Sequence, residues 1–211
     1  GKNILARAAT AEARAQLYTL SVQRMMSEPN EMKLRGVFEK ARESVPSVIL
    51  IPDLKALTLE GQKSPVAQQI ISWLVSEMDA LEDFGRVIVI GITSSPEELE
   101  QSLRQRFQKE IEVSLPDRQG RYEILKILTR KMPLARDVDL EKLADMTDKY
   151  RGVHLGSVCQ EAATRALRRT LEQEKLADEE IPKEELEQIK IEMDDFLHAI
   201  NSVKPEETGT Y

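Results

Sequence analysis

Short apolar runs rich in β-branched residues alternate with longer segments of helical periodicity over the first half of the chain. The runs at 48–51 (VILI) and 86–92 (RVIVIGI) are typical of strands buried on both faces of a parallel sheet. Segments 16–20 and 109–113 alternate apolar and polar residues, which predicts strands nearer an edge. Helical patterns lie between these runs, at 4–14, 30–44, 65–81 and 97–105. The alternation predicts an α/β fold, with a mostly parallel sheet and helices on both faces.

The helix expected at 65–81 shows the helical pattern most plainly. Its apolar residues form one stripe that can face the sheet: Val66, Ile70, Ile71, Leu74, Val75, Met78 and Leu81. Helix starts are also marked in the sequence. Asn30 is a typical N-cap, and Ser95-Pro96 has the composition of an N-cap followed by a first helical residue.

After Pro116-Asp117 the pattern becomes almost entirely helical. Helices are expected at 118–131, 138–149, 153–175, 183–189 and 193–203, with an extended piece at 189–191. Helical spacing predicts these inward-facing residues: Leu125, Leu140, Leu143, Leu155, Val158, Ala162, Ala166, Phe196 and Ile200. We therefore expect an α/β core over 1–117, a small helical domain over 118–203 and a linker-like tail over 204–211.

Composition and charge narrow the possible functions. Hydrophobic residues make up 41% and charged residues 32%, which is typical of a soluble globular protein. The net charge of -7 argues against a nucleic-acid partner, and no apolar run is long enough for a membrane span. The one cysteine, Cys159, lies in a helical run and is expected to be a buried thiol in a reducing, cytoplasmic setting. His154 and His198 are far apart and lack cysteine companions, so no zinc site is predicted.

Several phrases along the chain are specific enough to suggest a family. They are 34–51 (LRGVFEKARESVPSVILI), 87–94 (VIVIGITS), 132–143 (MPLARDVDLEKL), 162–169 (AATRALRR) and 191–200 (IEMDDFLHAI). Together they resemble the AAA family of ATPases, above all the first ATPase domain of archaeal ATPases similar to valosin-containing protein. The resemblance implies a P-loop NTPase-type core followed by a helical lid. It also implies ATP or ADP held between neighbouring AAA domains of an oligomeric ring, usually a hexamer, that handles a protein client.

The resemblance assigns the nucleotide-binding positions to Gly1, Lys2, Asn3 and Gly152. Gly1-Lys2-Asn3 matches the end of a P-loop, in which the lysine reaches the terminal phosphates. Asn3 stands where the family has the threonine that ligates Mg²⁺, and its amide oxygen is a poorer ligand. Gly152 lies in the lid phrase RGVH, and Leu128 replaces a histidine near the nucleotide.

The acidic pair that the family uses for catalysis is altered. Pro52 replaces the metal-associated aspartate, Asp53 replaces the catalytic glutamate, and Lys55 reverses a charge. These changes predict that the Mg²⁺ site is lost. Two interpretations of Asp53 stay open: a weak catalytic base that is one methylene too short, or a residue that only caps the end of a strand.

Three further family positions bear on catalysis and substrate handling. Ser94 occupies the position of the sensor asparagine. Arg106 matches the arginine finger that stabilises phosphoryl transfer in a neighbouring subunit, although a plain surface arginine at a strand start is an equal alternative. The segment that matches the pore loop, 23–29, has no aromatic residue, and its Met25 and Met26 are expected to pack in the core.

The altered positions occur together, whereas the apolar pattern that defines the fold is intact. The leading hypothesis is therefore a degenerate AAA module that does not hydrolyse ATP and acts as a structural or regulatory part of a ring. An active ATP-hydrolysing unfoldase or segregase domain is the first alternative. A monomeric adaptor that uses the fold for protein binding is the second.

Overall fold

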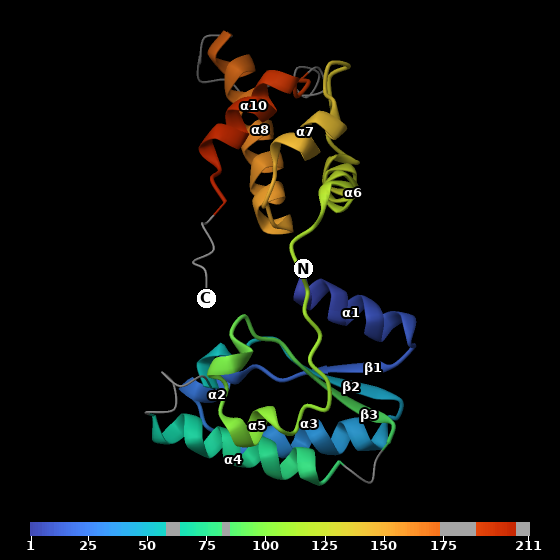
Figure 1. The fold of residues 1–211 in the computed structure, drawn as a ribbon, viewed down its shortest axis with the longest axis vertical. Coiled ribbons are helices and arrows are strands. Elements are labelled where there is room, and N and C mark those ends of the chain that lie inside the picture. The colour runs from blue at the N-terminus through green and yellow to red at the C-terminus, as the bar shows by residue number, and fades with distance from the viewer. Residues whose placement is uncertain (58–63, 82–84, 174–188, 206–211) are drawn as a thin grey trace. The chain divides into compact units, whose positions relative to one another are not determined.

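A computed structural model describes residues 1–57, 64–81, 85–173 and 189–205 (Figure 1). The chain divides into two compact units, one over residues 2–113 and one that begins at Ser114. Each unit has its own hydrophobic core.

The first unit is built on a parallel sheet. Its strands are β1 (Gln16–Thr19), β2 (Ser47–Ile51) and β3 (Val87–Gly91), in the order β1-β2-β3. All five residues of the central strand are buried, as expected for a parallel strand covered on both faces. The predicted parallel α/β architecture is therefore confirmed.

Helices cover both faces of this sheet. Helix α1 (Lys2–Glu12) lies over one face, whereas α3 (Glu31–Glu43) and α4 (Pro65–Asp79) lie against the other (Figure 1). The core between the sheet and α3 and α4 contains the fully buried Phe38, Ile49 and Leu74, as alternation along the strands and helical spacing require. Shorter elements complete the unit: α2 (Val22–Ser27), η1 (Lys55–Leu57), η3 (Pro96–Glu98) and α5 (Gln101–Arg104).

Local capping explains where these helices begin. The Asn30 side chain accepts a hydrogen bond from Lys33 N at 3.0 Å, which confirms its predicted N-cap role. The single helix expected at 97–105 is wrong, because the backbone is extended at Leu99 and Glu100 between η3 and α5. Glu100 instead caps a new helix by accepting a hydrogen bond from Leu103 N at 3.3 Å.

The edge strand expected at 109–113 is also wrong, since this segment is not a strand in the structure. Its Ile111 side chain is 74% exposed, and Glu110 is held by Arg104. A strand needs a neighbour that takes its N–H and C=O groups. Among the described residues β3 pairs only with β2, so this segment has no such neighbour.

The second unit consists of α6 (Arg118–Thr129), α7 (Leu140–Met146), α8 (Gly152–Gln173) and α10 (Met193–Ser202). Of its predicted inward residues, Leu140 and Ile200 are half-buried against the core and the other seven are buried. The extended piece is confirmed by a parallel bridge between Leu134 and Ile191. The helix expected at 183–189 lies outside the described residues, apart from Ile189. No helix in the described ranges is both long and apolar enough to cross a membrane.

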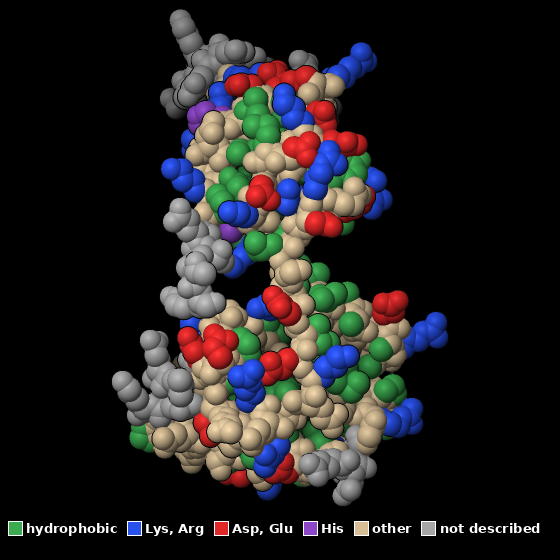
Figure 2. All heavy atoms as spheres, viewed as in Figure 1, with side chains coloured by type: hydrophobic (Ala, Val, Ile, Leu, Met, Phe, Trp, Pro, Cys, Tyr) green, Lys and Arg blue, Asp and Glu red, His purple; other side chains and the backbone are tan. Residues whose placement is uncertain are grey.

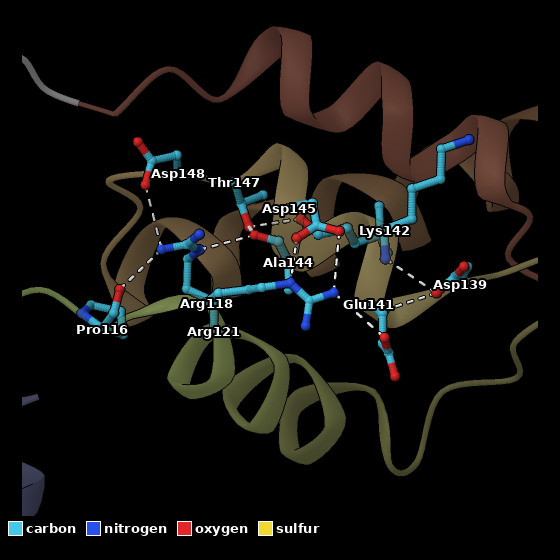
Figure 3. A network of polar contacts seen from close by, with 11 residues as sticks. Pro116, Arg118, Arg121, Asp139, Glu141, Lys142, Ala144, Asp145, Thr147 and Asp148 are labelled. Atoms are coloured by element: carbon cyan, nitrogen blue, oxygen red, sulfur yellow. Dashed lines mark hydrogen bonds and ion pairs between the residues drawn. The ribbon is translucent and has the colours of Figure 1, made fainter.

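A buried arginine joins the start of this unit to α7 (Figure 3). Arg121 donates from Nε to Ala144 O at 3.0 Å and from Nη1 to Pro116 O at 3.1 Å. Its exposed surface is only 6%, and Asp148 lies 3.6 Å from Nη1. The guanidinium therefore satisfies a carbonyl near the end of α7 and fixes the chain just before α6.

We predict that Gly91→Ala destabilises the first unit by about 1–3 kcal/mol, the usual cost of overpacking a core. A Cβ at Gly91 would lie 2.6 Å from Leu54 Cδ1 and 2.8 Å from Phe107 Cζ. Gly36→Ala is the control, because open space surrounds this helical glycine and alanine favours a helix. Urea unfolding followed through Trp73, the only tryptophan, measures both changes. Equal midpoints for the two variants would contradict this account of Gly91.

We predict that Arg121→Met destabilises the helical unit by about 1–3 kcal/mol, because it removes the buried donor that the carbonyl oxygens of Pro116 and Ala144 share. Arg118→Met is the matched control one turn earlier. Arg118 contacts Asp145 and Glu141 at the surface, where such pairs contribute little. Urea unfolding followed by far-ultraviolet circular dichroism compares them. An Arg118→Met loss as large as that of Arg121→Met would refute the buried role.

Candidate functional site

The carboxyl ends of β2 and β3 lie at one edge of the sheet, and α1 begins at the same edge. The link is direct, because Lys2 Nζ donates a hydrogen bond to Thr93 O at 2.7 Å across 91 residues of sequence. Lys2 is half-buried, whereas Gly1 and Asn3 are exposed. The structure therefore brings Lys2 to the loop that holds Ser94.

Backbone pairing continues past the ends of the two strands. Ile92 N donates to Ile51 O, and Leu54 N donates to Ile92 O, both at 2.9 Å. This pairing holds residues 52–54 beside the start of the 92–95 loop. Lys2, Asp53 and Ser94 therefore share one edge of the sheet, as expected for groups at the carboxyl ends of parallel strands.

The Asp53 carboxylate is used by the local backbone. It is exposed, and its Oδ1 accepts a hydrogen bond from Lys55 N at 3.0 Å, where η1 begins. This is an Asx turn, in which the side chain stabilises the turn after a strand. Pro52 beside it offers no side-chain ligand. Within the ranges that the structure describes, no three His, Cys, Asp or Glu residues gather as a metal-binding group.

Thr93 is a site residue that sequence reasoning missed. Its carbonyl holds Lys2, and its Oγ1 accepts a hydrogen bond from Ser95 N at 3.1 Å, which shapes the loop around Ser94. Ser94 itself is exposed. The only signal in the sequence was a polar residue placed just after a buried strand, and this signal does not reveal a contact made by a main-chain oxygen.

Gly152 lies in the second unit, where it begins α8 and has open space beside it. The neighbouring His154 lies in the first turn of this helix, and its Nδ1 accepts a hydrogen bond from Arg151 N at 3.3 Å, as the N3 side chain does in a capping box. The ring of His154 also meets the Tyr150 ring edge-on, with centroids 5.9 Å apart. Leu128 is 38% exposed and Val153 is 68% exposed, so this unit presents apolar side chains at these positions.

Arg106 lies in the first unit and is bound to its own chain. It follows α5 and forms a two-point ion pair with Asp79, the last residue of α4; Arg106 Nη2 lies 3.1 Å from Asp79 Oδ2, and Nε donates to Oδ1. The hydrogen bond from Arg106 lowers the pKa of Asp79. The expected placement at a strand start is therefore wrong: the described segment 107–113 is not a strand, and the side chain returns to α4.

Two residues close to Arg106 in the sequence make contacts of their own. Phe107 packs against the backbone at Gly91, and this contact fixes the turn after α5 against β3. Arg104 is engaged separately, because it donates to both carboxylate oxygens of Glu110 at 2.6 and 3.1 Å. Asp79 is a second residue that the sequence did not indicate as part of the site.

Other residues noted in the sequence are structural. Met25 is buried and Met26 is half-buried against the core, which confirms their predicted packing role. Both lie on the short helix α2. Cys159 is buried as expected, and this burial raises the pKa of its thiol to about 11. The thiol is therefore uncharged and a poor nucleophile at neutral pH.

The surface carries charges of both signs over each unit, intermixed on the face shown in Figure 2. Apolar side chains gather around α1, where Ile4 is 75% exposed and Leu5 is 55% exposed (Figure 2).

Comparison with known proteins identifies the family. The model of the ATPase family associated with various cellular activities (AAA) matches residues 1–115. The chain is 40% identical to a cell division cycle protein 48 homolog of Archaeoglobus fulgidus, over 97% of this chain and 29% of the relative. It is 39% identical to protein SAV of Sulfolobus acidocaldarius, over 97% of this chain and 27% of the relative. The corresponding values for protein CdcH of Halobacterium salinarum are 38%, 97% and 29%.

The chain thus spans less than a third of the length of the relatives that it matches. The family match covers more than half of this chain and includes the parallel sheet, Lys2 and Arg106. This chain belongs to the AAA family of ATPases.

Proposed function

We propose that this chain is a degenerate AAA module that does not hydrolyse ATP and serves as a structural or regulatory part of a ring of AAA domains. In such a ring its Arg106 acts on the nucleotide of a neighbouring subunit. The setting that fits this proposal is a cytoplasmic oligomer, such as a hexamer, that acts on a protein client.

The observation that carries the proposal is the environment of residues 52–55, the segment that matches the family's acidic catalytic pair. Hydrolysis in this family needs one carboxylate for the hydrated Mg²⁺ and another to activate water. Pro52 supplies neither, and the Asp53 carboxylate accepts the Lys55 N–H at 3.0 Å. A base that is one methylene too short and engaged elsewhere is poorly placed, since an error of about 1 Å can cost roughly a hundredfold in rate.

Phosphate binding at Lys2 does not depend on the residues that hydrolysis needs. Lys2 lies at the start of an 11-residue helix, where the helix dipole and a cation both favour an anion. Its ammonium group now contacts Thr93 O at 2.7 Å, and a phosphate oxygen is a stronger, charged acceptor. These residues fit the phosphates of ATP or ADP better than they fit Mg²⁺, because Pro52 offers no oxygen ligand and the Asp53 carboxylate already accepts the Lys55 N–H.

We predict that the chain hydrolyses ATP negligibly and that Asp53→Asn leaves this background rate unchanged, because the carboxylate serves the turn. A phosphate-release assay compares the parent, Asp53→Asn and Lys2→Ala. An active ATPase would instead turn over within about tenfold of a hydrolysing AAA domain and lose that turnover in Lys2→Ala, a difference of more than about 1.4 kcal/mol in activation free energy. That outcome would overturn the proposal. Light scattering that shows only a monomer would favour the adaptor alternative.

We predict that Arg106→Ala lowers the ATPase rate of an assembly with competent neighbours by about a thousandfold per dependent site, the usual contribution of an arginine in trans. Arg104→Ala is the control, because Arg104 is engaged by Glu110 and is not the proposed finger. Circular dichroism checks that both variants remain folded. Parental activity in the Arg106→Ala assembly would leave the module with an architectural role only.

A further inference from the structure

The ion pair between Arg106 and Asp79 occupies the edge of the guanidinium that recognises anions. Nε and Nη2 both donate to the Asp79 carboxylate. This two-point geometry is the one by which arginine grips a carboxylate or a phosphate. The same edge cannot hold the Asp79 carboxylate and a phosphate at the same time.

The C-terminal end of α4 also favours the position of Arg106 beside Asp79. Asp79 is the last residue of this helix, and no basic residue lies in its last turn. Helix carbonyl groups at this end carry partial negative charge, so a carboxylate here is unfavourable without a nearby cation. Arg106 compensates both the Asp79 charge and the helix end, although 106 and 79 are 27 residues apart in sequence.

The Arg106–Asp79 pair is nevertheless exposed enough for another anion to replace the Asp79 carboxylate. The side chains of Arg106 and Asp79 keep 34% and 44% of their surface accessible to solvent. Exposed ion pairs of this kind are weak, equivalent to a factor of about five or less in an equilibrium. By contrast, the carboxylate of Glu77 is buried, and the half-buried Arg42 lies 2.8 Å from it, between α3 and α4.

We propose that Asp79 is a latch on Arg106: it holds the guanidinium on the module's own surface until a nucleotide phosphate of the neighbouring subunit replaces the carboxylate. This inference rests on the proposed trans role of Arg106. The exchange swaps one anion for a more highly charged one, so no buried charge is left without a partner. The latch keeps Arg106 withdrawn when the neighbouring site holds no phosphate in reach.

The test compares Asp79→Asn with Glu110→Gln, which releases the adjacent Arg104 instead. Asparagine keeps the shape of the side chain but removes the charge. In the assembly we expect Asp79→Asn to raise the ATPase rate by about two- to fivefold at subsaturating ATP, and Glu110→Gln to leave it unchanged. The double variant Asp79→Asn with Arg106→Ala should behave like Arg106→Ala alone, because the latch acts only through Arg106.

A second measurement needs no activity. In the chain alone, NMR of the Arg106 Nε–H group, assigned through Arg106→Lys, should show faster proton exchange with water in Asp79→Asn than in the parent. Equal exchange in both proteins would overturn the latch. A third outcome is also informative. If Asp79→Asn changes the proton exchange and Arg106→Ala lowers the ATPase rate, but Asp79→Asn does not raise that rate, the Arg106–Asp79 ion pair exists and the latch is wrong. If Arg106→Ala has no effect on the ATPase rate, the proposed trans function fails instead, and the latch fails with it.

Discussion

Parallel pairing of β2 with a strand on each side is the constraint on which the first unit depends. All five β2 residues are buried, so helices must cover both faces of the sheet. Parallel strands also end at one common edge, and α1 starts there. Lys2 meets Thr93 O for this reason, and Asp53 and Ser94 follow the ends of neighbouring strands. The position of the candidate site is thus a consequence of how the sheet is buried.

Cationic side chains at the key positions are bound by acceptors of the same chain. Arg121 is buried and donates to the main-chain oxygens of Pro116 and Ala144, so its removal takes away a donor that these two oxygens share. Arg106 is paired at the surface, and Lys2 is half-buried on a carbonyl. The degree of burial distinguishes cations that fix structure from cations that can bind a ligand. A buried cation such as Arg121 is out of reach of a ligand and fixes structure, whereas an accessible one can exchange its acceptor for a ligand.

Folding constrains the core of the first and second units more strongly than it constrains the candidate site. Residues such as Phe38 and Phe196 are completely buried, and a change of volume there costs stability. Asp53 and Ser94 are exposed, so folding places little constraint on them. Substitution at these positions can alter chemistry without disturbing the fold, and this is the physical basis of the proposal that the module acts without hydrolysing ATP.

Local patterns were sufficient for the parallel sheet, the cap at Asn30 and most of the buried faces, because alternation, helical spacing and capping act over a few residues. They were insufficient for segment 109–113, whose strand-like alternation lacks a neighbouring strand in the described structure. They also missed Thr93 and Asp79, which contact Lys2 and Arg106 across 91 and 27 residues. Sequence alone determined which chemical groups this protein has. Tertiary structure decided which acceptor each cation meets, because such contacts depend on distances between segments that no local pattern encodes.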